Sequence, residues 1–175
     1  MSHSNTTRSI AVEVQAGTAR LNGDLSVPDK TRGLVVFAHG SGSSRFSTRN
    51  RYVAGLMNEA GLATLLFDLL TADEEAVDQY SREFRFDIGL LSQRMTSTVD
   101  WLLDQKLIAD LPIGLFGAST GAAAALNAAA NRPQRVAAVV SRGGRPDLAM
   151  ELLPRVEAPT LLIVGGDDHE VILLN

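Results

Sequence analysis

The chain has 175 residues, of which 45% are hydrophobic and 21% are charged, and its net charge is −4 with a pI near 5.3. These values predict one domain over residues 1–175 and exclude the broad basic surface that nucleic-acid binding requires. The lack of cysteine excludes disulfides and thiol catalysis. No apolar run is long enough to cross a bilayer, and the first residues lack the apolar core of a signal peptide, so we expect a soluble, cytoplasmic protein.

The first elements predicted along the chain are strands. Ser9–Gln15 and Ala19–Val27 alternate apolar and polar side chains, which is typical of strands with one exposed face. A turn near Ala16 and Gly17 joins them, so we expect an antiparallel pair. The next strand, Gly33–Gly40, is a continuous apolar run, which is typical of a strand buried on both faces.

Helices and buried strands alternate after this point. A helix is predicted to end near Gly61, because apolar residues recur before it at helical spacing: Tyr52, Val53, Leu56, Met57 and Ala60. The strand Leu62–Asp68 and an acidic connection over residues 71–87 then lead to a long helix. The inner face of that helix is marked by Leu91, Met95, Trp101 and Leu102.

The second half of the chain continues the alternation. In order, it predicts a buried strand at 111–117, a helix at Ala118–Ala130, a strand at 135–144, a short helix at Pro146–Leu153 and a further buried strand at Thr160–Val164. Strands alternating with helices predict an α/β fold, in which helices cover both faces of a mainly parallel sheet. Polar clusters follow these strands at their carboxyl ends, where such sheets bind ligands.

The segment Gly117-Ala118-Ser119-Thr120-Gly121 stands where a buried strand turns into an alanine-rich helix, and it fits the pattern G-x-S-x-G. In this context the pattern predicts a nucleophile, because a very tight turn lifts the Ser119 hydroxyl out of the sheet. Both flanks must be glycine because side chains there would strike the neighbouring strand and helix. The alternative is that Ser119 only caps the helix.

Two backbone amides are expected to stabilise an oxyanion beside this serine. One is the N–H of Thr120, at the start of the helix, and the other is the N–H of Ser41, in the glycine-containing loop Ala38–Ser44 after an earlier strand. His39 lies next to this loop. We expect it to be a structural residue, hydrogen-bonded under the loop, and the alternative is that it acts as the catalytic base.

An acidic residue is expected after a later strand to complete a catalytic triad. Asp167 and Asp168 directly follow the strand Thr160–Val164 and its glycine pair. Two adjacent carboxylates cannot both face the site, and we choose Asp168 as the catalytic acid. The alternative is that both aspartates only form a turn.

Arginines gather after two of the predicted strands: Arg45, Arg49 and Arg51 after the first, and Arg142 and Arg145 after the second. Our candidates for binding a substrate carboxylate are Arg45 and Arg142. The alternative is that the arginines lie on the surface in weak ion pairs with acidic residues of the 71–87 connection, namely Glu74, Glu75 and Asp78.

Four segments together resemble the dienelactone-hydrolase-like α/β-hydrolases, which occur alone or fused to phosphoribosyltransferase domains. The segments are "LVVFAHGSGSSRFSTRNRYVAGLMNEAGLATLLFDLLTADEE", "GLFGASTGAAAAL", "VVSRGGRPDLA" and "PTLLIVGGDDHEVILLN". The resemblance implies an α/β-hydrolase fold, a Ser/Asp/His triad, carboxylic-ester or lactone substrates, and no cofactor or metal.

The chain departs from this family in two ways. The founding dienelactone hydrolases carry cysteine at the nucleophile position, where this chain has Ser119. The family's histidine lies after one more strand, and we expect the final helix–strand–helix segment to be absent here. Of the three histidines, His3, His39 and His169, none is a convincing base. The missing strand would also leave the apolar strand Thr160–Val164 as an open sheet edge.

Two hypotheses follow from the sequence. The first is a serine hydrolase that acts on a small ester or lactone through an acyl group on Ser119. The second is a catalytically silent α/β-hydrolase-like module for binding or assembly, which the lack of a suitable histidine favours. Under either hypothesis we expect no nucleic-acid or membrane partner, and self-association through the open sheet edge.

Overall fold

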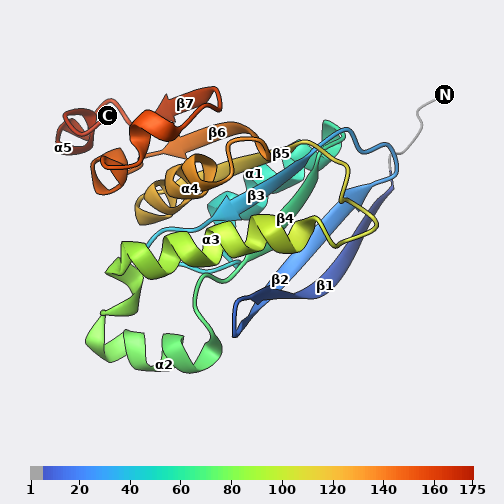
Figure 1. Cartoon of the computed structure of the whole chain (residues 1–175), viewed down its shortest axis with the longest axis horizontal. Coiled ribbons are helices and arrows are strands. Elements are labelled where there is room, and N and C mark those ends of the chain that lie inside the picture. Colours follow the sequence, from blue (N-terminus) through green and yellow to red (C-terminus); the bar gives the residue numbers. More distant parts are fainter. Residues whose placement is uncertain (1–5) are drawn as a thin grey trace.

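The computed structural model describes residues 6–175, which form a seven-stranded sheet with helices on both faces (Figure 1). The strands lie in the order β1-β2-β4-β3-β5-β6-β7. β2 is antiparallel to β1 and to β4, and all other neighbours are parallel. The strands are β1 Thr7–Ala16, β2 Ala19–Pro28, β3 Leu34–Ala38, β4 Ala63–Phe67, β5 Ile113–Ala118, β6 Val136–Arg142 and β7 Thr160–Ile163. The predicted α/β fold is confirmed. One of the three histidines considered as a base, His3, lies outside the described residues.

The helices divide between the two faces of the sheet. In Figure 1, α3 and α4 lie on the near face and α1 lies on the far face. The helices are α1 Thr48–Glu59, α2 Ala72–Ser81, α3 Ile88–Leu102, α4 Thr120–Asn131 and α5 His169–Ile172. None of the helices in residues 6–175 is both long and apolar enough to cross a membrane.

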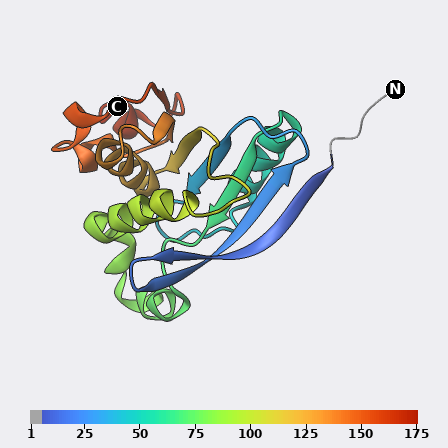
Figure 2. The ribbon, with the colours of Figure 1, turned by 45° about the vertical axis from the view of Figure 1, so that its right-hand side comes forward.

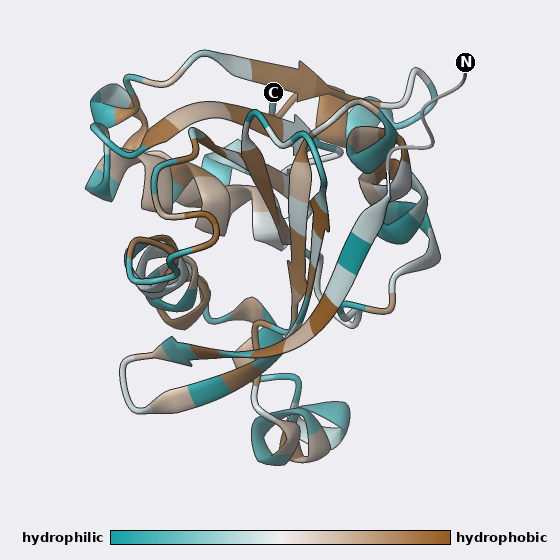
Figure 3. Cartoon of the chain, turned by 90° about the vertical axis from the view of Figure 1, so that its right-hand side faces the viewer, coloured by the Kyte–Doolittle hydropathy of each residue, from teal (hydrophilic) through white to brown (hydrophobic). Residues whose placement is uncertain are grey.

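The central strands separate two parts of the core. Phe37 of β3 and Phe116 of β5 point toward α1, with their ring centroids 5.0 Å apart. Val36 and Leu115, one position earlier on each strand, belong to the larger cluster under α3 and α4. Figure 3 shows the resulting hydrophobic centre of the sheet. Because both faces are covered, these strands are continuous apolar runs in the sequence.

The β1–β2 hairpin confirms the predicted antiparallel pair. Its register runs from Thr7 opposite Pro28 to Ala16 opposite Ala19. Gly17 forms the turn with a φ of 63°, a conformation that side chains disfavour. Figure 2 shows that the two strands are long and reach away from the rest of the sheet.

The acidic connection over residues 71–87, in which no helix was predicted, contains the helix α2. Thr71 accepts a hydrogen bond from the Glu74 N–H, and Glu74 accepts one from the Thr71 N–H, which is a capping box. The proposed ion pairs with this segment are wrong. The guanidinium of Arg94 pairs with Glu74, and that of Arg85 pairs with the fully buried Asp78.

The last third of the chain is less regular than predicted. Instead of one short helix, the segment after β6 contains two 3₁₀ turns, Pro146–Ala149 and Leu153–Arg155. β7 follows them at the end of the sheet and pairs only with β6. All four of its residues are exposed. The predicted open sheet edge is therefore present in the part of the chain that the structure describes.

Candidate active site

Ser119 occupies a strained turn between β5 and α4. Its backbone has a φ of 50° and a ψ of −123°, a region that residues with side chains rarely adopt. Its hydroxyl makes no capping hydrogen bond to α4, although Ser119 stands at the N-cap position. The interpretation of Ser119 as a simple helix cap therefore fails. The turn is held from two sides, because the Ser119 N–H donates to the Arg142 carbonyl and the Arg145 N–H donates to the Ser119 carbonyl.

The two glycines that flank Ser119 are required by packing, as the sequence predicted. A Cβ atom at Gly117 would overlap the backbone of Gly121 and Ala122, in the first turn of α4. A Cβ atom at Gly121 would overlap the carbonyl groups at the end of β3. The alanine-rich helix α4, whose residues Thr120–Ala130 are all buried, can thus lie directly against the sheet below the serine.

The two residues chosen for the oxyanion site lie together. Ser41 and Thr120 both line a small void of about 10 Å³, which also contacts Gly40. Among the described residues, neither the Ser41 N–H nor the Thr120 N–H donates a backbone hydrogen bond. Gly40 lies close to the serine, since a Cβ atom there would be 3.2 Å from the Ser119 Cβ. The loop after β3 therefore packs against the turn of Ser119 through Gly40, whereas Ser41 and Thr120 line the void and not the cleft that Ser119 lines.

His39 is a structural residue under this loop. Its Nε2 atom accepts a hydrogen bond of 3.0 Å from the Leu69 N–H, and its Nδ1 atom lies 2.9 Å from the Gly40 carbonyl oxygen, to which it donates. The side chain is only 8% exposed, and burial lowers the pKa of the imidazole. Because both ring nitrogens are engaged, His39 has no free lone pair with which to act as a base.

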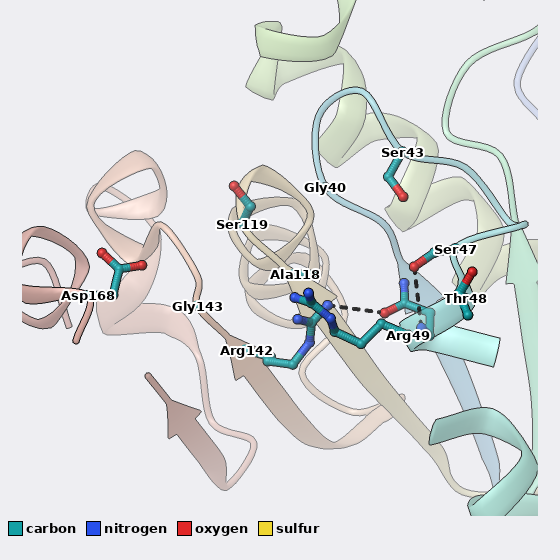
Figure 4. Close-up of a pocket in the computed structure, with 11 residues that line it drawn as sticks. Gly40, Ser43, Ser47, Thr48, Arg49, Ala118, Ser119, Arg142, Gly143 and Asp168 are labelled. Carbon is teal, nitrogen blue, oxygen red and sulfur yellow. Dashed lines mark hydrogen bonds between the residues drawn. The ribbon is translucent and has the colours of Figure 1, made fainter. Parts of the chain in front are cut away.

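A cleft of about 550 Å³ opens at the carboxyl ends of the strands (Figure 4). Ser119 and Asp168 both line it, on different elements, as Figure 4 shows. The Asp168 carboxylate is exposed and accepts a hydrogen bond of 3.3 Å from the Val171 N–H, so in this structure it caps α5. The remaining lining residues are Gly40, Ser43, Ser47, Thr48, Arg49, Asn50, Ala118, Arg142 and Gly143. No histidine of the described residues lines the cleft.

The structure separates the two arginines proposed for substrate binding. Arg142 lines the cleft beside Ser119. Arg45 lies outside it, where its guanidinium pairs with Asp68 and Asp24. The second guanidinium in the cleft belongs to Arg49, in the first turn of α1. The sequence placed Arg49 in the same cluster as Arg45 but gave no reason to prefer it, because only the packing shows which of the two lacks an acidic partner.

Solved structures include a close relative of this chain. The crystal structure of a dienelactone hydrolase from Anabaena variabilis is 57% identical to it and superposes with a TM-score of 0.95. The superposition covers 97% of this chain and 78% of that one. A cold-adapted esterase from an Arctic intertidal metagenomic library is 15% identical, with a TM-score of 0.67 over 94% of this chain and 74% of its own, and shows the fold alone.

Curated relatives extend well beyond this chain in length. In two strains of Mycobacterium tuberculosis, a protein named "Putative phosphoribosyl transferase" is 59% identical over 164 residues. The match covers 94% of this chain but only 36% of the relative. No family model matches the sequence.

Proposed function

Because this chain belongs to the dienelactone-hydrolase-like α/β-hydrolases, we propose that it is a serine hydrolase of carboxylic esters or lactones. The observation that carries the proposal is the strained, uncapped Ser119 on the wall of a cleft. Strain of this kind persists only where the surroundings enforce it, and it is concentrated at functional sites. We further propose that the substrate is a small molecule, that no cofactor takes part, and that the protein works in the cytoplasm.

In the proposed reaction, the Ser119 Oγ atom attacks the acyl carbon of the bound ester. The carbonyl oxygen becomes an oxyanion that accepts hydrogen bonds from the N–H groups of Ser41 and Thr120. The bond to the alcohol breaks, the proton of the serine passes through a base to the alcohol, and the acyl group stays on Oγ. Water then attacks the acyl group, which releases the acid and restores Ser119. With a lactone, alcohol and acid remain in one product.

The base in this reaction is proposed to be a histidine oriented by Asp168, on the wall of the cleft that also holds Ser119. No described residue of the cleft is a histidine, and the chain spans only 36% of the length of its curated relatives. We therefore propose that the imidazole comes from outside the described residues. A site made only of the described residues should turn over slowly, since triads that lack a member keep only about 10³–10⁴-fold catalysis over water.

The test is rescue of the missing base by free imidazole. The wild-type chain should hydrolyse an activated aryl ester slowly and should react weakly with a fluorophosphonate probe, and added imidazole should increase both rates. The variant Ser119→Ala should lose the hydrolysis, its rescue and the labelling, whereas Ser43→Ala, which removes another hydroxyl of the same cleft, should keep all three. Activity that persists in Ser119→Ala would overturn the proposal.

The second candidate function is a silent binding or assembly module. The observation that favours it is the cleft without a histidine in the described residues. If the wild-type chain neither hydrolyses the ester nor reacts with the probe, even with imidazole present, this candidate replaces the first.

A further inference from the structure

Arg142 is the exception among the arginines that the protein shields from water. Every other buried or half-buried arginine of residues 6–175 has a carboxylate within ion-pair distance: Arg45, Arg85, Arg94, Arg132 and Arg145. Arg142 is half-buried, and its only side-chain hydrogen bond in that range is a long one of 3.3 Å to the Asn50 Oδ1 atom. Its Nε atom is buried without any partner. A guanidinium left so incompletely paired is costly, because buried charges are normally paired.

Arg49 adds a second positive charge at the same place. Figure 4 shows the Arg49 and Arg142 side chains next to each other in the cleft. Burial lowers the pKa of Arg142, and the charge of Arg49 lowers it further. Neither guanidinium forms an ion pair with a described acidic residue. Two like charges brought together at the rim of a cleft are stabilised if an anion binds between or across them.

The remaining groups on this side of the cleft suit an anion as well. Ser47 and Thr48 contribute hydroxyl groups, and the first turn of α1, which begins at Thr48, contains no acidic residue. The positive end of the helix dipole therefore adds to the charge of the arginines. The one carboxylate of the cleft, Asp168, lies apart from the arginines in Figure 4 and is engaged with the Val171 N–H.

We propose that Arg49 and Arg142 form a subsite for a phosphate group carried by the ester substrate of Ser119. A phosphate monoester has a charge close to −2 above its second pKa, which matches two guanidinium groups, and its three free oxygens match their many donors. A carboxylate offers half the charge and two oxygens. Since both arginines line the cleft that holds Ser119, one molecule can place its phosphate here and its ester at the serine. The subsite itself does not depend on the proposed function. Only the statement that the phosphate belongs to an ester substrate of Ser119 rests on it.

Binding of inorganic phosphate tests the subsite without any turnover. Titration into the Ser119→Ala variant at about pH 8, followed by calorimetry and amide chemical shifts, should show binding centred on Arg142 and α1. Arg49→Gln and Arg142→Gln should each weaken it roughly tenfold or more, because each removes charge-assisted hydrogen bonds. Arg142→Lys should give an intermediate affinity, and Arg155→Gln, at an exposed arginine that does not line the cleft, should give the parent value. Thermal unfolding of each variant identifies any that fails to fold.

Several outcomes would overturn the inference. Absence of phosphate binding, or an affinity of Arg49→Gln and Arg142→Gln equal to that of the parent, would eliminate the subsite. Acetate that binds as tightly as phosphate would identify a carboxylate subsite and contradict the choice of phosphate. Phosphate binding is measured in Ser119→Ala, which cannot use the proposed nucleophile. These results therefore test the subsite even if the serine-hydrolase proposal fails. For the link to the ester, the wild-type chain should favour a phosphate-bearing aryl ester over its neutral analogue, and Arg142→Gln should remove most of that preference.

Discussion

The two ends of the proposed catalytic constellation are built very differently. The turn at Ser119 is fixed by close packing, with Gly117 and Gly121 pressed against neighbouring backbone and α4 fully buried below it. The end that carries Asp168 is held by little, since β7 is exposed along its whole length and α5 is one exposed turn. Both ends line the same cleft.

The difference shows where a fold must be rigid to prepare a nucleophile. A residue at a φ of 50° cannot keep that conformation unless its surroundings hold it there, so the strain at Ser119 and the packing around it belong together. Asp168 adopts no strained conformation and needs no such support. The first region should therefore respond strongly to small substitutions, and the second should tolerate them.

The largest effect is expected from Gly121→Ala. Its new Cβ atom would overlap the carbonyl oxygens of Ala38 and His39, which cannot move without separating α4 from β3. We expect a loss of about 3 kcal/mol or more in the free energy of unfolding, at or above the upper end of the usual cost of core overpacking, because the overlapped atoms are backbone. Urea denaturation measures it.

The matched control is Gly55→Ala, in α1. A Cβ atom at Gly55 would meet nothing within 4 Å, and alanine favours the helix by roughly 1 kcal/mol. This variant should be as stable as the parent or more so. If Gly121→Ala unfolded at the same urea concentration as Gly55→Ala, the close contact of α4 with the sheet would be disproved.

The next effect is a pH dependence that originates at His39. Burial lowers the pKa of its imidazole, so the folded chain resists protonation while the unfolded chain takes up a proton near pH 6.5. The free energy of unfolding should therefore be fully retained above about pH 6.5 and fall below it, by up to about 1.4 kcal/mol per pH unit, until the folded imidazole is also protonated.

Urea denaturation of the parent and of His39→Gln between about pH 5 and pH 7.5 isolates this contribution, because the carboxylates titrate alike in both. The difference in stability between the two proteins should shrink as the pH falls. A difference that stays constant over this range would show that His39 is not held neutral under the loop after β3.

A smaller effect of opposite sign is expected from Ser119→Gly. Glycine adopts a φ of 50° without steric cost, and relief of the strain is worth roughly 1–3 kcal/mol, from which the entropy of glycine subtracts up to about 1 kcal/mol. The variant should thus be more stable than the parent by about 1 kcal/mol. Ser119→Ala keeps a Cβ atom and should gain nothing, and equal midpoints for the two variants in thermal unfolding would contradict the strain.

Sequence reasoning was most successful where local chemistry determines structure. The continuous apolar runs predicted the buried strands β3, β4 and β5, and the glycines around Ser119 predicted the tight turn there, because each follows from the residues of one segment. The prediction that β7 is a buried strand is wrong, since its four residues are exposed at the end of the sheet. The helix α2 was missed although Thr71 and Glu74 form a capping box, since the acidic composition of the segment concealed the signal. The choice of Arg45 over Arg49 was wrong, because the acidic partners that hold Arg45 outside the cleft come from β2 and from the loop after β4.

The open sheet edge should make the 175-residue chain self-associate. Leu161, Leu162 and Ile163 of β7 are 57%, 40% and 45% exposed, and the strand pairs only with β6. Apolar edge strands of this kind pair with other chains, and lysine on the edge prevents it. Sedimentation velocity over a concentration series should show association that Leu161→Lys weakens and that Leu107→Lys, at a leucine 54% exposed elsewhere, does not. A monomer at all concentrations would disprove the expectation.

The smallest effect on stability is expected from Asp168→Asn. The lost interaction is one hydrogen bond of 3.3 Å to the Val171 N–H, at the start of a helix of a single turn, and asparagine caps helices about as well as aspartate. We expect a change in the free energy of unfolding within about 0.5 kcal/mol, the range of surface substitutions. Asp167→Asn, at an exposed neighbour that does not line the cleft, is the control. In any form of the protein that supplies a catalytic histidine, the two variants should instead separate in kcat, with Asp168→Asn losing far more, because a triad carboxylate orients the imidazole and stabilises the imidazolium. A large loss of stability in Asp168→Asn would mean that β7 and α5 are as firmly held as the turn at Ser119. A larger loss of kcat in Asp167→Asn would transfer the role of catalytic acid to that residue.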